Sequence, residues 1–252
     1  MTESSHSSYW KDVRSPRYSL LLALPLLLLY EVLAAALAGP QAGLRNGADV
    51  VLQTLIVGAV GPRGTLYVTA AVILLCVAWA VRDARRHGGV RVAWFPLMLL
   101  ESAALSVVFA VVVSVATAQL LTGLGAALLT AAASQAPAAP APLDPATALM
   151  LSLGAGLYEE LLFRVLLVTG IAAGLRALLG MSAMTAGVIA CVASAILFSA
   201  FHYVGAYGDT FTVESFTFRA IAGLAFSALY LLRGFGITAW THALYDVGVM
   251  VL

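Results

Sequence analysis

Two adjacent glutamates and an arginine lie within an apolar stretch of this 252-residue sequence. Glu159 and Glu160 are followed by Arg164 in the segment YEELLFR. On a helix, Glu160 and Arg164 are four residues apart and can pair side by side, whereas Glu159 points about 100° away. Glu159 therefore needs a different partner across the protein. A carboxylate in such surroundings is a candidate general base, and an ion pair at a helix end is the structural alternative.

Two of the four histidines lie in other apolar stretches. Before His202, small residues recur every four positions: Ser182, Ala186, Ala190 and Ser194. Such a stripe lets a neighbouring helix approach closely, and Phe198 and His202 continue the same face, so we expect His202 to face protein. His242 and Asp246 are also four residues apart and share a helix face. Taken singly, each of these features is also typical of a buried, hydrogen-bonded group without a catalytic role.

These residue types allow three hydrolytic mechanisms to be compared. A zinc site is disfavoured because the sequence has no HExxH motif. A serine nucleophile is disfavoured because Ser194 and Ser199 lie outside any GxSxG turn, and no lysine lies in the apolar segments. A water molecule activated by a carboxylate is the remaining hydrolytic mechanism.

The composition determines what kind of protein must position these residues. Hydrophobic residues make up 62% of the chain and charged residues 10%, against about 45–50% and roughly 25% in soluble domains. A water-soluble globule is excluded, and the periodicity is entirely helical, so the sequence predicts an all-α, polytopic integral membrane bundle. The formal net charge of +1 gives no basic surplus for nucleic acid. The expected partners are the lipid bilayer and a membrane protein or peptide substrate.

Apolar segments of about 20 residues mark the expected membrane spans. We expect spans at 18–38, 64–82, 93–119, 183–204 and 235–251, one between residues 205–214 and Arg233, and those in the segment 146–179. Basic residues before the first span and in the segment 82–91 place both regions in the cytoplasm. The Ala/Pro-rich segment 123–145 is typical of an extended linker and is expected outside.

The apolar segment 146–179 forms either one overlong helix, which gives seven spans, or two short helices, which give about eight. A fold-back near Phe163 brings the acidic pair, His202 and Asp246 to the same depth. Ionisable residues in a bilayer almost always meet partners, so we predict the fold-back, with eight spans and both termini in the cytoplasm. Residues 205–214 are then cytoplasmic. Arg176 and Arg233 are placed outside, against the charge rule.

Three segments in this order, EExxxR, FxxxH and HxxxD, resemble the CPBP family of intramembrane proteases, which includes the CAAX prenyl endopeptidases and bacteriocin-processing or immunity proteins. The resemblance covers roughly residues 146–250. It divides the chain into a cytoplasmic tail (1–17), N-terminal helices with an outer loop (18–145) and a catalytic membrane domain (146–252). It implies an eight-helix, all-α bundle whose site opens toward the cytoplasmic leaflet and needs no metal or other cofactor.

The resemblance also implies a role for each motif residue. Glu159 would activate water together with His202, and His242 and Asp246 would stabilise the oxyanion. Three further residues would support the site: Glu160, Arg164 and Phe198.

One residue departs from the family pattern. The last motif often ends in Asn, whose amide can donate to an oxyanion, whereas an ionised Asp246 only accepts. Asp246 is either protonated, or it holds His242 as an imidazolium that alone donates to the oxyanion. We favour the second explanation, because a neighbouring cation stabilises developing negative charge.

The sequence therefore predicts a glutamate-type intramembrane endopeptidase of a membrane-associated or lipidated protein or peptide, expected in the inner (cell) membrane of a bacterium. The alternatives are a non-catalytic immunity or binding protein and a proton-coupled transporter. The lack of visible repeats and of paired broken spans disfavours the transporter. The sequence leaves the substrate open among prenylated tails, secretion leaders, sorting anchors and regulatory membrane proteins.

Overall fold

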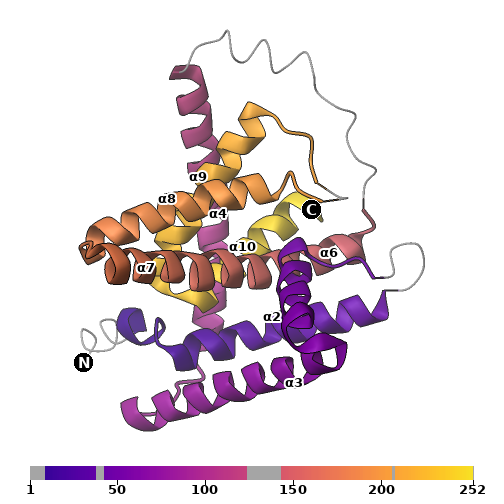
Figure 1. Cartoon of the computed structure of the whole chain (residues 1–252), viewed down its shortest axis with the longest axis vertical. Coiled ribbons are helices and arrows are strands. Elements are labelled where there is room, and N and C mark those ends of the chain that lie inside the picture. The colour runs from indigo at the N-terminus through magenta and orange to yellow at the C-terminus, as the bar shows by residue number, and fades with distance from the viewer. Residues whose placement is uncertain (1–8, 38–42, 124–142, 206–207, 252) are drawn as a thin grey trace.

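The computed structural model describes residues 9–37, 43–123, 143–205 and 208–251, apart from the side chains at 65, 66 and 69. This part of the chain is helical and has no strand (Figure 1). Its elements are α2 (Pro16–Ala36), α3 (Gly47–His87), α4 (Trp94–Gly123), α6 (Pro145–Gly154), the π-helical η1 (Ala155–Glu159) and η2 (Leu161–Val168), α7 (Thr169–Leu179), α8 (Ala183–Phe201), α9 (Val213–Arg233) and α10 (Phe235–Met250).

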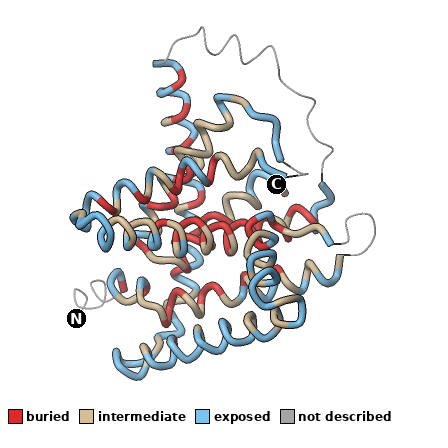
Figure 2. The backbone as a smooth tube through the Cα atoms, viewed as in Figure 1, coloured by how far each residue is buried: buried red, intermediate tan, exposed pale blue. Residues whose placement is uncertain are grey.

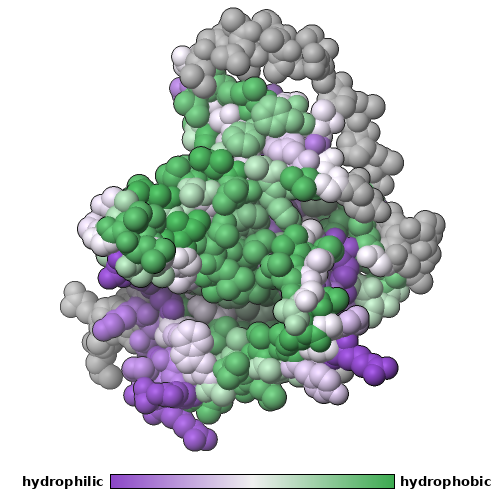
Figure 3. All heavy atoms as spheres, in the orientation of Figure 1, coloured by the Kyte–Doolittle hydropathy of each residue, from purple (hydrophilic) through white to green (hydrophobic). Residues whose placement is uncertain are grey.

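Five helices are long and apolar enough to cross a membrane: α2, α4, the continuous helix Pro145–Leu179, α8 and α9. Large apolar side chains on their outer faces are exposed, and Figure 3 shows them as a broad hydrophobic surface. An exposed apolar surface of this extent is typical of lipid contact. The structure thus confirms an all-α, polytopic membrane protein. The expected spans 64–82 and 235–251 lie in the second half of α3 and in the 16-residue α10, and neither helix is among the five.

The predicted fold-back near Phe163 is wrong, because residues 145–179 form one continuous helix. A turn there would leave several backbone N–H and C=O groups without partners inside an apolar bundle. The sequence between Tyr158 and Thr169 offers no Gly or Pro to make such a turn. The 35-residue helix is roughly 50 Å long, well beyond the thickness of the bilayer core of about 30 Å.

The long helix and α8 form a helical hairpin that makes the fold-back unnecessary. The helix ends at Gly180, whose φ of 63° is left-handed, and α8 begins after its N-cap Ser182. Glu159 lies about 20 residues before this turn and His202 about 20 residues after it, which is a rise of about 30 Å along each arm. The two arms therefore bring His202 level with Glu159.

The ends of the bundle are identified by antiparallel packing of α8 and α9. Ser199 donates to the carbonyl of Phe216 at 2.7 Å, and a Cβ on Gly223 would lie 2.9 Å from the Cα of Ala195. The start of α8 therefore lies at the same end as Arg233, and residues 203–205 and 208–212 lie at the other end.

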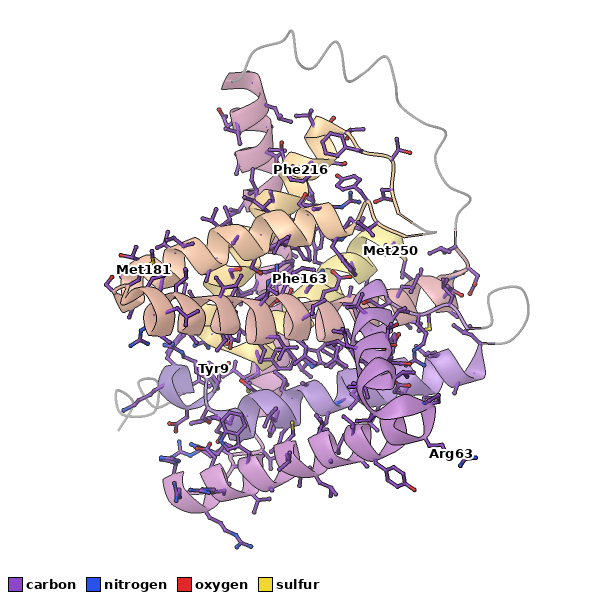
Figure 4. All side chains as sticks on the ribbon, in the orientation of Figure 1. Tyr9, Arg63, Phe163, Met181, Phe216 and Met250 are labelled. Carbon is purple, nitrogen blue, oxygen red and sulfur yellow. The ribbon has the colours of Figure 1, made fainter. Side chains whose placement is uncertain are left out.

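The N-terminal segment packs at the end that contains Arg233. Arg14 donates to the carbonyl of Leu231 at 2.7 Å, and Arg17 pairs with Asp83 at 2.9 Å. We call this the basic end, because it gathers most of the Lys and Arg residues: Lys11, Arg14, Arg17, Arg82, Arg85, Arg86, Arg91, Arg176 and Arg233. Figure 4 shows Tyr9 and Met181 on this side and Met250 on the opposite side.

This arrangement corrects the expected topology in two respects. Residues 82–91 and 208–214 lie at opposite ends, although a shared cytoplasmic side was expected. Arg176 and Arg233 lie with the other basic residues, so the conflict with the charge rule disappears. Since α10 runs away from the basic end, the described N- and C-terminal segments also lie at opposite ends, as an odd number of spans requires.

The core lies around the middle of the long helix, where Figure 2 shows a concentration of buried residues. The long helix packs there against α2 and α10, and the buried cluster contains Ala23, Leu26, Tyr30, Met150, Leu153, Leu157, Ala239 and Ala243. The acidic pair follows this cluster directly, so its side chains project from the best-packed part of the protein.

Candidate active site

Two glycines in the long helix let other segments approach the acidic pair. A Cβ on Gly154 would lie 2.5 Å from the ring of Tyr30 and 2.9 Å from the Cβ of Asn46. A Cβ on Gly156 would lie 2.3 Å from the carbonyl oxygen of Ala239 in α10. Neither contact leaves room for a side chain, so glycine allows both segments to pack closely against this helix.

The backbone of the long helix widens at the acidic pair. The π-helical segments Ala155–Glu159 and Leu161–Val168 lie on either side of Glu160. Such π-helical turns are rare and occur frequently at functional sites. Here they flank the residue that pairs with Arg164 and His242.

Glu159 points toward the start of α3. Its carboxylate is buried, with 7% of the residue exposed, and its Oε1 accepts a hydrogen bond from the side-chain amide of Asn46 at 2.8 Å. The other oxygen, Oε2, has no hydrogen-bond partner among the described residues. The carboxylate also interacts electrostatically with His202 and His242. The prediction that Glu159 needs a partner different from that of Glu160 is thus confirmed.

Glu160 joins Arg164 to His242. Its Oε1 accepts from Nδ1 of His242 at 2.7 Å and lies 3.1 Å from Nη1 of Arg164. The contact with Arg164 is an ion pair without hydrogen-bond geometry, since Nη1 has no hydrogen-bond partner. The guanidinium group lies against two aromatic rings, 4.5 Å from the centroid of Phe198 and 5.3 Å from that of Phe226. The predicted pair is therefore present, and Glu160 also orients a histidine.

His242 lies between two carboxylates. Its Nδ1 contacts Glu160, and its Nε2 lies 3.6 Å from Oδ2 of Asp246. Its ring stacks on Phe226 with the centroids 4.3 Å apart. His242 donates a hydrogen bond from Nδ1 to Glu160 and makes none to Asp246, so Glu160 fixes the ring orientation. Asp246 lies near Nε2, the ring nitrogen that remains available.

His202 caps the end of α8 and is oriented by its own helix. Its Nδ1 lies 2.8 Å from the carbonyl oxygen of Phe198. A carbonyl oxygen only accepts, so Nδ1 carries a proton, and Nε2 is the ring nitrogen that remains available. Phe198 packs edge-on against this ring at 4.9 Å and against Phe163 at 5.2 Å, and Figure 4 labels Phe163 at the centre of the bundle.

The small-residue stripe of α8 packs on the long helix as predicted. Ala186, Ala190 and Ser194 are buried, and the hydroxyl of Ser194 donates to the carbonyl of Phe163 at 2.7 Å. Ser199 likewise donates to a backbone carbonyl, that of Phe216. Both hydroxyls have structural partners, which agrees with the preference for a carboxylate mechanism.

Asn46 is a partner of Glu159 that the sequence did not predict. This residue lies 113 positions before Glu159 in a polar connection, and no local pattern links the two. A weak signal was available: Asn-Gly directly before an apolar helix is typical of an N-cap. The side chain of Asn46 indeed accepts from the N–H of Ala48 at the start of α3.

The fold and the site define a class of protein: a polytopic helical membrane protein with carboxylates and imidazoles buried together inside it. Among the described residues, no group of three or more His, Cys, Asp or Glu side chains is arranged to hold a metal ion. Metal independence stays a prediction.

Residues 141–248 match the family model described as type II CAAX prenyl endopeptidase Rce1-like. The match includes all three motifs and confirms the family resemblance over that part of the chain. It supports intramembrane protease activity in general terms. No curated protein and no solved structure matches the chain.

Proposed function

We propose that this chain is an intramembrane endopeptidase in which Glu159 and His202 activate a water molecule. The observation that carries the proposal is Oε2 of Glu159, a buried carboxylate oxygen without a hydrogen-bond partner among the described residues, in a group that interacts with His202. A polar buried atom beside an imidazole suits a water molecule that must lose a proton.

In the proposed reaction, Oε2 of Glu159 takes a proton from water while the water oxygen attacks the carbonyl carbon of the scissile peptide bond. Nε2 of His202 accepts a hydrogen bond from the same water and orients it. The tetrahedral intermediate then collapses, the C–N bond breaks, and the proton held by Glu159 passes to the departing amine nitrogen. The products are a carboxylic acid and an amine, so all protons are accounted for.

The oxyanion would be stabilised by His242. Glu160 accepts from its Nδ1, which leaves Nε2–H of the imidazolium to donate to the developing negative charge. Asp246, 3.6 Å from that nitrogen, would favour the imidazolium through its charge. This assignment explains how an Asp can stand where related proteins often have Asn. Arg164 and Phe198 would hold Glu160 and His202 in place.

We further propose a membrane-associated or lipidated protein or peptide as the substrate. The family name supports a prenylated C-terminal tail as the first class to test. The proposed location is the inner (cell) membrane of a bacterium, with residues 18–145 as N-terminal helices and residues 146–252 as the catalytic domain.

The test is peptide cleavage by the purified chain in liposomes. Fluorogenic peptides with and without a prenyl group would be compared for the wild-type protein and Glu159→Ala. We expect cleavage by the wild-type protein and loss of cleavage in the variant. Equal cleavage by both would refute the proposal. Toxin protection that persists in Glu159→Ala would favour a binding protein, and proton-coupled flux by the wild-type protein in liposomes would favour a transporter.

A further inference from the structure

We infer that Asn46 is a positioning residue for the general base, supplied by the N-terminal half of the chain. This inference rests on the proposed function of Glu159. Asn46 lies outside the region 141–248 that matches the family, yet its amide makes the one hydrogen bond that the Glu159 carboxylate has among the described residues.

The orientation of the Asn46 amide follows from its second contact. Oδ1 accepts from the backbone N–H of Ala48 at 2.9 Å, which only an oxygen can do. The amide nitrogen must therefore be the atom that lies 2.8 Å from Oε1 of Glu159. Only 7% of Asn46 is exposed, so water competes little for this donor.

The backbone of Asn46 is tied to α2. Its N–H donates to the hydroxyl of Tyr30 at 3.1 Å, and that hydroxyl donates to Asp49 at 2.8 Å. Asp49 is ion-paired with Arg45, which also pairs with Glu31 at 2.7 Å. These contacts fix the loop before α3 from both sides.

The neighbouring residues leave space for Asn46 between the long helix and α8. Gly154 has no side chain where Tyr30 and Asn46 pack. A Cβ on Gly47 would lie 3.2 Å from the ring of Phe201, the residue before His202. Asn46 thus lies between the two elements that carry the proposed base and its histidine partner.

The two oxygens of Glu159 therefore have different roles in the proposed reaction. Oε1 already accepts the Asn46 N–H and is the less basic oxygen, whereas Oε2 has no partner among the described residues, so the proton taken from water goes to Oε2. The amide also holds the carboxylate in the rotamer that presents Oε2 to the site. A hydrogen bond of this kind, made to a charged group, is among the stronger ones in proteins.

The main test is Asn46→Ser in the liposome cleavage assay. Serine keeps the N-cap, since Ser and Asn cap helices about equally well, but its side chain is too short to reach Glu159. We expect kcat to fall about 10- to 100-fold, which corresponds to the loss of one hydrogen bond to a charged group. KM should stay within about twofold of the wild-type value, and the unfolding temperature should be unchanged. A second variant, Tyr30→Phe, removes the hydroxyl that accepts from Asn46 and should lower kcat less.

The matched control is Asp144→Ser, which changes the N-cap of α6 far from Glu159 and should leave kcat unchanged. Glu159→Gln is measured in parallel.

If Glu159→Gln is inactive while Asn46→Ser keeps the wild-type kcat, the inference about Asn46 is wrong and the proposed function stands. If Glu159→Gln keeps the wild-type kcat, the proposed function itself fails. If Asn46→Ser does not fold, an unchanged kcat in Tyr30→Phe overturns the inference and a lowered one supports it.

Discussion

Nδ1 of His242 lies 2.7 Å from Oε1 of Glu160, although the two residues are 82 positions apart in the sequence. Adjacent glutamates therefore have separate partners: Glu159 contacts Asn46 and Glu160 contacts His242. Each carboxylate has one oxygen, Oε2, without a hydrogen-bond partner among the described residues, but Glu160 is also ion-paired with Arg164. This difference predicts that the two glutamates respond differently to the same substitution.

Glu159→Gln should mainly lower activity, whereas Glu160→Gln should mainly lower stability. Glu159→Gln removes a proton acceptor and keeps the shape, so kcat should fall about 10²–10⁴-fold with little loss of folded protein. Glu160→Gln leaves the buried Arg164 without its carboxylate, and breaking a buried pair costs about 3–5 kcal/mol. Cleavage kinetics and thermal unfolding in detergent measure the two effects. A stable but inactive Glu160→Gln beside an active Glu159→Gln would reverse the assignment.

The carboxylate mechanism predicts a difference between Asn and Ala at position 246. Asp246→Asn should keep substantial activity, because an amide near Nε2 of His242 can donate to the oxyanion directly. Asp246→Ala should lose about 10²–10³-fold in kcat, the range for one lost oxyanion-stabilising group. An Asn variant as inactive as the Ala variant would show that the charge of Asp246, acting through His242, is essential.

The carboxylate mechanism predicts full activity in a strong chelator. A zinc hydrolase would lose activity and recover with added metal, because its nucleophile is a metal-bound hydroxide. The measurement is kcat before and after exhaustive chelation, with a known metalloprotease as the positive control. Inhibition that metal reverses, together with an inactive Asp246→Asn, would favour the metal mechanism.

Close packing at Gly156 predicts a position where one methyl group is costly. In Gly156→Ala the new Cβ meets a backbone carbonyl of α10 at 2.3 Å, which cannot move aside like a side chain, so stability and activity should both fall. The matched control is Gly170→Ala in α7, where no atom lies within 4 Å. That variant should be stabilised by up to about 1 kcal/mol through helix propensity. Equal unfolding temperatures for the two variants would contradict this packing argument.

The ends of the bundle predict the result of labelling with an impermeant thiol reagent. With Cys76 and Cys191 replaced by Ser, Arg86→Cys and Thr210→Cys should react from opposite sides of the membrane. The positive-inside rule places the basic end in the cytoplasm, so only Thr210→Cys should react from outside. The candidate site would then lie in the outer half of the bundle, against the cytoplasmic opening that the family resemblance implies. External labelling of Arg86→Cys alone would support the cytoplasmic opening.

The sequence predicted which residues meet at the site better than it predicted their contacts. The residue types and four-residue spacings of the three motifs were sufficient to predict that the acidic pair and the two histidines meet, because charged groups in an apolar bundle need partners. The orienting role of Glu160 was not predictable in this way. Its contact with His242 depends on the packing of α10 against Gly156, which no spacing rule describes.

The error about residues 146–179 has a specific physical origin. Hydropathy within single spans places His202 and Glu159 at different depths when 146–179 is one helix. The depth of each residue depends instead on its distance from the turn at Gly180, and the two residues are about equally far from that turn. The fold-back also placed Arg176 and Arg233 outside, which the charge rule disfavours. In the structure both arginines lie at the basic end.

The hairpin also constrains how the length of this chain can vary during evolution. Because each arm contributes about 20 residues between the turn and the site, a single residue gained or lost in one arm would rotate its functional side chain by about 100° and displace it by about 1.5 Å. Such a change would be tolerated only with a compensating change in the other arm. Functional relatives should therefore conserve the number of residues between the acidic pair and the histidine of FxxxH, and their length differences should accumulate in the loops outside this interval.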